Sequence, residues 1–348
     1  MADRVLVTGI SGFIGGHVAL GLLQAGYMVR GSLRDMRRVG EVTAALGRPG
    51  AELSRLEFVQ LDLTDDRGWR AALAGCRYLQ HVASPIAVRM PRHRNALVEP
   101  AVSGVRRALG AALAADVERI VMTSSAAAVS YGHAAGRSES FTGADWSAVA
   151  GDDVNAYTES KTRAELEAWS LVEEQGRRQD FAAINPTVVL GPLLAPDPGV
   201  SPVLIQRLLE GIPFAARVAL NLVDVRDVAA LHLAAMRTPG AGGQRYIASA
   251  TPMTLVELIE ALRAAFPAYA RRLPRFVAPD WLVRLYARVH PEARDHVREL
   301  GRVRRFDTRP AEALLGRPFI TPRLAAAATA QSLVDFGLVR PPPDEKRG

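Results

Sequence analysis

Short apolar runs alternate with segments of helical periodicity through the first half of the chain. Runs of this length and composition are typical of buried strands. They predict strands at 5–8, 26–33, 56–61, 77–82, 118–123 and 181–184. The intervening segments predict helices that begin at Phe13 or cover 41–46, 69–74, 98–115 and 155–175. Strands that alternate with helices predict a doubly wound parallel sheet, so we expect an α/β fold.

The pattern is less regular after the proline-rich connection at 192–202. It predicts strands at 221–225 and 245–249, and helices through Met236 and at 255–265. The remainder has helical spacing, and 341–348 is typical of a disordered tail. We therefore expect a larger domain of residues 1–190, to which 218–248 returns, and a smaller, mostly helical substrate domain formed by 191–217 and 249–340.

Three glycines follow the first strand directly. Gly9 allows a sharp turn, Gly12 allows a backbone to approach a pyrophosphate, and Gly15 allows a helix to pack close to the strand. The N–H groups at the start of that helix would face the phosphates. An ordinary glycine-rich turn is the alternative, but the strand and helix on either side favour a dinucleotide site in a Rossmann-type domain. The expected contacts of this turn are Gly9, Ser11, Gly12, Phe13, Ile14 and Gly15.

Composition excludes several classes of protein. At 348 residues, with 49% hydrophobic and 23% charged residues, the chain is an ordinary globular sequence. It contains no apolar run of about 18 residues, so we expect no membrane span. The first strand starts almost at once, so we expect no signal peptide. Cys76 is the single cysteine, which excludes an intrachain disulfide and fits a cytoplasmic location.

The chain carries a net charge of +7, with a marked arginine cluster at 298–305. A nucleic-acid surface is one interpretation, but no nucleic-acid module is visible, and solvated arginines explain the charge better. We expect neither a nucleic acid nor a membrane as partner. His290 and His296 are too far apart to share one helix face as metal ligands, so no metal is expected.

Tyr157 and Lys161 are four residues apart in a predicted helix and would be neighbours on one face. A nearby ammonium stabilises a phenolate, which makes Tyr157 a candidate general acid for carbonyl reduction or base for alcohol oxidation. The chain has only two lysines, Lys161 and Lys346, among 43 Lys and Arg residues. A lysine in this one helix therefore indicates a requirement for a compact donor. A surface lysine beside a half-buried tyrosine is the alternative.

These motifs together resemble the extended short-chain dehydrogenase/reductase family. Within that family, the sequence is most similar to the dihydroflavonol reductase, cinnamoyl-CoA reductase and aldehyde/ketone reductase group. The stretches that carry the resemblance are 8–15, 29–35, 62–63, 81–85, 98–102, 123–125, Tyr157 with Lys161, 185–187, 191–192 and 223–228. The last third matches only loosely.

The resemblance implies roles for individual residues. It implies a catalytic triad of Ser125, Tyr157 and Lys161, with Lys161 also holding the nicotinamide ribose. Ser124 is the rival serine, and we prefer Ser125 because it directly precedes the small residues 126–128. The remaining implied cofactor contacts are Asp62 and Leu63 at the adenine, Val82, Ala83 and Ser84 along the cofactor, and Pro186 and Thr187 near the nicotinamide.

The end of the second strand bears on the choice of cofactor. NAD-binding dinucleotide folds usually place an acidic residue there, whereas this chain has Leu33 followed by Arg34. An arginine can bond a 2′-phosphate, and Arg30, Arg37 and Arg38 add positive charge. Asp35 is the contrary observation, although we expect Arg34 to neutralise it. We therefore favour NADP(H) over NAD(H), with Arg34 and Arg38 as contacts.

Three functions remain open. The first is an NADP-dependent oxidoreductase that reduces a ketone or aldehyde, or runs the reverse, with Tyr157 as proton donor. The second is a sugar-nucleotide epimerase with permanently bound NAD(P), an alternative that the faintly epimerase-like run 129–132 keeps open. The third is a dinucleotide-binding regulator without turnover, against which the Tyr–Lys pair argues. We expect a small-molecule carbonyl or alcohol as substrate, and a monomer or homodimer.

Overall fold

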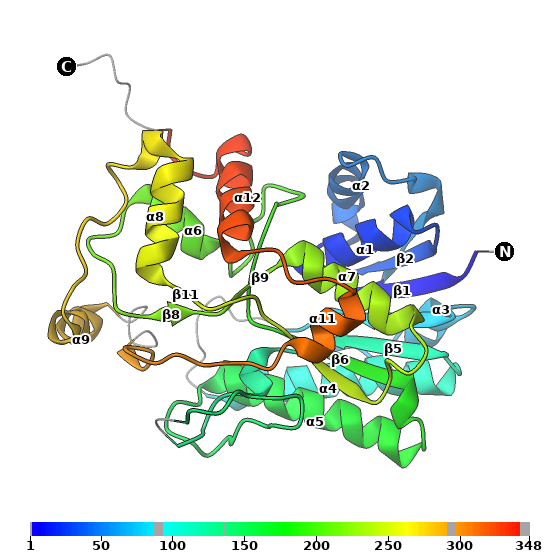
Figure 1. Cartoon of the computed structure of the whole chain (residues 1–348). Helices are drawn as coiled ribbons and strands as arrows, with labels where there is room; N and C mark the ends of the chain where they lie inside the picture. Colours follow the sequence, from blue (N-terminus) through cyan, green and yellow to red (C-terminus); the bar gives the residue numbers. More distant parts are fainter. Residues whose placement is uncertain (1, 86–92, 135–136, 291–296, 342–348) are drawn as a thin grey trace. The chain divides into compact units, whose positions relative to one another are not determined.

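The computed structural model describes residues 2–85, 93–134, 137–290 and 297–341. The described chain divides into two compact units, and Figure 1 shows their elements. Unit 1 contains residues 1–187, 226–248 and 306–318, and unit 2 contains residues 188–225, 249–305 and 319–348. Each unit therefore contains segments that are far apart in the sequence.

Unit 1 is built on a parallel sheet of seven strands in the order β10-β6-β5-β4-β1-β2-β3. All its neighbouring strands run parallel, which confirms the predicted doubly wound α/β class. The strands are β1 (Arg4–Thr8), β2 (Met28–Leu33), β3 (Leu56–Gln60), β4 (Tyr78–His81), β5 (Arg119–Thr123), β6 (Phe181–Pro186) and β10 (Gln244–Ala248).

Helices cover both faces of this sheet. Figure 1 shows α4 and α5 on one face, and α1 and α7 on the other. The helices are α1 (Phe13–Gln24), α2 (Val39–Gly47), α3 (Trp69–Leu73), α4 (Asn95–Ala114), α5 (Ala156–Glu174), α7 (Val225–Arg237) and α11 (Arg309–Leu315). Short 3-10 turns are η1 (Met36–Arg38), η2 (Leu53–Arg55), η3 (Ala126–Ala128) and η4 (Arg178–Asp180).

A large hydrophobic cluster of unit 1 lies between the sheet and helices α3, α4 and α5. Small residues on α4, among them Ala101, Ala108 and Ala112, let this helix approach the sheet closely, while Trp169 of α5 packs edge-on against Phe181 of β6. Burial of this continuous apolar layer fixes α5 against the strand ends, and α5 is the helix that carries Tyr157 and Lys161.

Unit 2 has two small sheets and several helices. Its strands pair as β7 (Val188–Leu190) with β9 (Leu222–Asp224), in parallel, and as β8 (Ala219–Leu220) with β11 (Met253–Thr254), antiparallel. Its helices are α6 (Val203–Glu210), α8 (Leu255–Ala265), η5 (Pro267–Tyr269), α9 (Asp280–Val289) and α12 (Pro322–Asp335). Thr329 and Ser332 of α12 accept hydrogen bonds from the backbone N–H groups of Gly191 and Leu193.

The second half of the chain differs in detail from the expected pattern. The strand expected at 221–225 is present as β9, which is shorter because α7 begins at Val225, and the separate strand β8 directly before it was not expected. Residues 306–318, which we assigned to the smaller domain, belong to unit 1, where Phe306 packs on Phe141 and Arg317 pairs with Asp227. The expected disordered tail lies, from residue 342 onward, outside the described residues. Within the described part of the chain, no helix combines the length and apolar character needed to span a bilayer.

Candidate active site

The glycine turn has the geometry that a bound dinucleotide requires. Gly9 follows β1 with a φ of +70°, and the N–H of Gly12 donates to the Gly9 carbonyl at 2.9 Å. A Cβ at Gly15 would overlap that same carbonyl oxygen, so α1 can start this close to the turn only with glycine there. The N-cap residue of α1 is Gly12, which has no side chain with which to cap the helix. Its first-turn N–H groups therefore suit a diphosphate, and the residues present fit the cofactor.

The end of β4 is tied to the same turn through Thr8. The Thr8 hydroxyl accepts hydrogen bonds from the N–H groups of Val82 at 3.0 Å and Ala83 at 3.1 Å, and it bonds His81 Nδ1 at 3.1 Å. A Cβ at Gly9 would lie 2.9 Å from the Ala83 Cα. The β1 turn and the segment of Val82, Ala83 and Ser84 are thus held against one another, as a shared cofactor site requires.

Strand β2 ends at Leu33, as expected. The acidic residue two positions later, Asp35, forms an ion pair with Arg37. Asp35 accepts hydrogen bonds from the Arg37 guanidinium, at 2.7 Å for Nη2, and from the Arg37 N–H at 3.0 Å. The side-chain bonds from Arg37 lower the pKa of the Asp35 carboxyl to about 2. We expected Arg34 to neutralise Asp35, and this was wrong: η1 places Arg37 rather than Arg34 on the carboxylate.

The other arginines near β2 have different partners: Arg38 contacts the glycine turn, and Arg30 contacts α3 and β3. Arg38 reaches back to the glycine turn, with Nη1 3.3 Å from Ser11 Oγ. Arg30 instead lies in the middle of β2, where it bonds the Ala72 carbonyl at 2.7 Å and the Glu57 carboxylate at 2.7 Å. Since Arg30 stabilises the end of α3, it does not add charge at the cofactor turn as we expected. Arg34 is exposed directly after the strand.

The turn after β3 contains Asp62 and Leu63. The Asp62 carboxylate accepts from the N–H and hydroxyl of Thr64 at 2.8 and 2.7 Å, and these bonds hold its pKa below the usual range, with a smaller contribution from the charge of Arg34. Leu63 packs on Gly104 of α4. Asp62 is therefore ionised at neutral pH and lies near Arg34, on the side of the sheet edge where the adenine end is expected.

Ser125 and Tyr157 meet at the end of β5. Ser125 begins η3 in an extended conformation and its Oγ accepts the Ala127 N–H at 3.1 Å. Asn155 caps the N-terminus of α5, which brings Tyr157 into the first turn of that helix. Tyr157 Oη then lies 3.4 Å from Ser125 Oγ.

Lys161 lies one turn further along α5. It is 5% exposed, and its Nζ is 5.9 Å from the centre of the Tyr157 ring. Burial, with a smaller contribution from the Lys161 charge, lowers the pKa of His81 to about 4. His81 is therefore neutral at physiological pH and adds no second positive charge beside this ammonium.

The two candidate serines have different partners. Ser124 donates its hydroxyl hydrogen to Glu165 Oε2 at 2.5 Å, on the α5 side of the sheet, and it is 2% exposed. Ser125 instead faces Tyr157. Ser124 is thus engaged in the core, while Ser125 has a hydroxyl next to the phenol.

The last two expected contacts follow β6. Pro186 is the final residue of that strand and is in register with Ala248 of β10. The N–H and hydroxyl of Thr187 both donate to the Ala248 carbonyl, at 3.0 and 3.3 Å. The expected contacts that follow β1 to β6 thus lie at the carboxyl ends of those strands, the edge where open parallel sheets bind ligands, and Tyr157 meets Ser125 there from α5.

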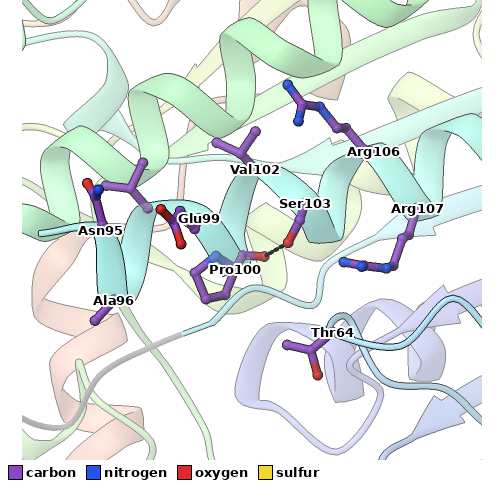
Figure 2. A pocket seen from close by; sticks show the side chains of 10 residues that line it. Thr64, Asn95, Ala96, Glu99, Pro100, Val102, Ser103, Arg106 and Arg107 are labelled. Carbon is purple, nitrogen blue, oxygen red and sulfur yellow. Dashed lines mark hydrogen bonds between the residues drawn. The ribbon is translucent and has the colours of Figure 1, made fainter.

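A cavity of about 610 Å³ lies between α4 and the loop that contains Thr64 (Figure 2). Pro100 inside α4 has no N–H to donate to the helix, and Arg106 and Arg107 line the same opening. Both arginines already have acidic partners, Glu167 and Asp66. None of Ser125, Tyr157 and Lys161 lines this cavity, so we do not assign the chemistry to it. Within the described ranges, no three His, Cys, Asp or Glu side chains are grouped as metal ligands, and His296 falls outside those ranges.

The fold and the residues at its strand ends define an NAD(P)-dependent oxidoreductase of the short-chain dehydrogenase/reductase type. The sequence model of the NAD-dependent epimerase/dehydratase family matches residues 5–248. The chain belongs to this family, and within it to the extended reductase group, which confirms the expected family and enzyme class.

Known reductases are similar over most of the chain. Cinnamoyl-CoA reductase 2 of Medicago truncatula is 34% identical over 77% of this chain and 78% of its own length. The bifunctional dihydroflavonol 4-reductase/flavanone 4-reductase of Pyrus communis is 33% identical over 77% and 78%. The crystal structure of the yeast methylglyoxal/isovaleraldehyde reductase Gre2, complexed with NADPH, aligns with a TM-score of 0.78 at 27% identity, covering 96% of this chain and 99% of that one. The expected preference for NADP(H) agrees with this complex.

Sequence reasoning missed a buried polar cluster behind the serines, made by Glu165, Asn185 and Arg245. Glu165 follows Lys161 by four residues and Tyr157 by eight, so a carboxylate on the same helix face as the expected catalytic pair was the available signal. Nothing in the local pattern pointed to Arg245, since it is one of many arginines and 80 residues away from Glu165.

Proposed function

We propose that this protein reduces a ketone or aldehyde to an alcohol with NADPH, or catalyses the reverse reaction, at Ser125, Tyr157 and Lys161. The observation that carries the proposal is the approach of Tyr157 Oη to within 3.4 Å of Ser125 Oγ, beside a buried lysine. Two hydroxyl groups this close can both hydrogen-bond one substrate oxygen. A dinucleotide-binding regulator would have no need of this arrangement.

Each side chain has a separate task. Ser125 holds the carbonyl oxygen and orients it towards the phenol, and Tyr157 Oη gives its proton to that oxygen as negative charge develops there. Lys161 then stabilises the phenolate that remains. The reduced nicotinamide, when bound, supplies the hydride for the carbonyl carbon, so that hydride and proton together make the alcohol. In the reverse direction, Tyr157 takes the proton of the alcohol.

The choice of NADPH follows from the turn after β2. Arg34 and Arg38 bind the 2′-phosphate: Arg34 is the first residue after the strand, and Arg38 already reaches Ser11 in the glycine turn. Asp35 does not compete for the ribose, because Arg37 holds its carboxylate. The yeast relative, 27% identical to this chain, is described in complex with NADPH.

A panel of carbonyl compounds tests the reaction. Methylglyoxal, isovaleraldehyde, a dihydroflavonol and cinnamoyl-CoA correspond to the names of the relatives, and a sugar nucleotide represents the epimerase alternative. We expect NADPH to be consumed in a one-to-one ratio with at least one carbonyl compound. Conversion of the sugar nucleotide without net loss of NADPH would instead establish the epimerase.

The Tyr157→Phe variant tests the assigned proton donor. It should lose more than nine-tenths of turnover on the best compound of that panel, while its affinity for NADPH, measured by fluorescence titration, stays close to that of the wild type. A variant that keeps more than a tenth of the turnover would show that another group donates the proton.

A further inference from the structure

The carboxylate of Glu165 is buried completely and surrounded by donors from β6, β10, α5 and the residue that follows β5. It lies on α5, and Arg245 Nε of β10 donates to its Oε1 at 2.6 Å. Its Oε2 accepts from Ser124 Oγ at 2.5 Å and from Asn185 Nδ2 at 2.7 Å. The Trp169 indole N–H adds a longer bond of 3.3 Å to Oε1. A single carboxylate therefore joins helix α5 to the carboxyl ends of β5 and β6 and to β10.

Arg245 extends these connections to the loop that follows Ser125. Its side chain is 6% exposed and lies 3.6 Å from the centre of the Trp146 ring. Nη2 bonds the Ala128 carbonyl at 3.3 Å, and Nη1 bonds the Gly143 carbonyl at 3.0 Å. The guanidinium therefore holds both the end of η3 and the loop 142–146 against α5.

Asn185 connects the cluster directly to the candidate catalytic serine. Its Nδ2 donates both to Glu165 Oε2 and, at 3.1 Å, to the Ser125 carbonyl. The serine is thus held by its own carbonyl, by the hydroxyl of the preceding Ser124, and by the anchored turn at Ala128. Tyr157 lies two helical turns before Glu165 on the same helix. The cluster therefore links the Ser125 backbone to the helix that carries Tyr157, and so determines the distance between Ser125 Oγ and Tyr157 Oη.

We propose that Glu165, Asn185 and Arg245 are positioning residues that hold the Ser125 hydroxyl at the correct distance from Tyr157. This inference rests on the proposed function. Replacing a buried ion pair by apolar residues is often neutral or stabilising, because desolvation of the two charges offsets their attraction, so stability is a weak reason for this cluster. Its directed hydrogen bonds, by contrast, hold the backbone on both sides of the Ser125 hydroxyl.

The test compares Glu165→Gln with a matched control, Glu167→Gln. Glu167 is on the same helix and also pairs with an arginine, Arg106, but at the surface. With the carbonyl compound that gives the highest kcat/KM in the panel, Glu165→Gln should lower kcat by ten- to a hundredfold and leave the KM for NADPH within twofold. Glu167→Gln should leave both unchanged. Unchanged kcat in Glu165→Gln, or a loss confined to the KM for NADPH, would overturn the inference.

A double-mutant cycle with Ser125→Ala separates positioning from general damage. If Glu165 acts through the serine, Glu165→Gln should change kcat by less than threefold once Ser125 is alanine, since the group that it positions is gone. An equal loss in both backgrounds would overturn the inference while leaving the proposed function intact. Full activity of Ser125→Ala would instead refute the assignment of the site itself.

A second variant covers the case in which Glu165→Gln does not fold. Asn185→Ala removes the bond to the Ser125 carbonyl but leaves the Glu165–Arg245 pair in place. It should lower kcat at least fivefold, and the loss should again disappear in the Ser125→Ala background. Loss of kcat that persists there would contradict the proposal.

Discussion

Two buried histidines make the stability of unit 1 depend on pH. His232 of α7 lies under the sheet with Nδ1 2.7 Å from Gln80 Oε1 and Nε2 2.8 Å from Thr123 Oγ1. Burial lowers its pKa from 6.5 to about 3, and lowers the pKa of His81 to about 4. Both folded-state values lie below the unfolded value. The free energy of unfolding therefore has its full value above pH 6.5. It falls progressively as the pH drops from 6.5 towards 4, because in this range the unfolded chain binds protons that the folded chain does not.

The size of the effect follows from the number of protons. Each histidine changes the free energy of unfolding by about 1.4 kcal/mol per pH unit in this window, so at pH 5 the two together remove about 4 kcal/mol. The variant His232→Gln keeps a polar side chain but cannot titrate, and should lose about 2 kcal/mol from His81 alone. The stability gap between wild type and variant should thus narrow by about 2 kcal/mol between pH 7.5 and pH 5.

Urea unfolding at a series of pH values measures this gap. Tryptophan fluorescence reports mainly on unit 1, because Trp69, Trp146 and Trp169 belong to it. Carboxylates titrate alike in both proteins, so their contribution cancels in the difference. A gap that stays constant from pH 7.5 to pH 5 would refute the conclusion that His232 is neutral in the folded protein.

Three further predictions concern the candidate site. Lys161→Arg should lose most turnover and bind NADPH more weakly in a fluorescence titration, because a guanidinium is too broad for the buried position of the ammonium; an active variant would contradict this. Arg34→Ala should lower kcat/KM for NADPH about ten- to a hundredfold more than for NADH, the equivalent of one charge-assisted hydrogen bond, whereas equal losses would exclude Arg34 from phosphate binding. Gly15→Ala should weaken NADPH binding at least tenfold, because the added Cβ overlaps the Gly9 carbonyl. The control is Gly110→Ala in α4, which should not change the affinity, because a Cβ there meets nothing within 4 Å. Similar NADPH affinities in the two variants would contradict the role of the glycine turn.

Local features of the site could be predicted from the sequence because each involves neighbouring residues. The glycine turn, the end of β2 at Leu33 and the Tyr157–Lys161 spacing all depend on a few consecutive positions. The partner of Asp35 was predicted incorrectly although it too is local. The choice between Arg34 and Arg37 depends on the 3-10 turn η1, which periodicity does not reveal.

Contacts between residues far apart in the chain could not be predicted from the sequence, for a different reason. Arg245 reaches Glu165 only because β10 adds to the edge of β6, and Phe306 reaches Phe141 only because the chain returns to unit 1 after residue 305. A hydrophobic pattern indicates that a segment is buried, but the pattern does not specify which distant segment packs against it. A single sequence contains no such information.

The late position of β10 in the chain has a consequence for the order of synthesis. When residues 1–187 have left the ribosome, Ser125, Tyr157 and Lys161 all exist, and so do six strands of the sheet. The outer edge of β6 still has no neighbouring strand, and the Glu165 carboxylate has no arginine. Both are supplied only at residues 244–248, after the first segment of unit 2, residues 188–225, has been made. The nascent protein therefore contains all three proposed catalytic residues before it contains β10 and Arg245, and co-translational folding of unit 1 must wait for the chain to return.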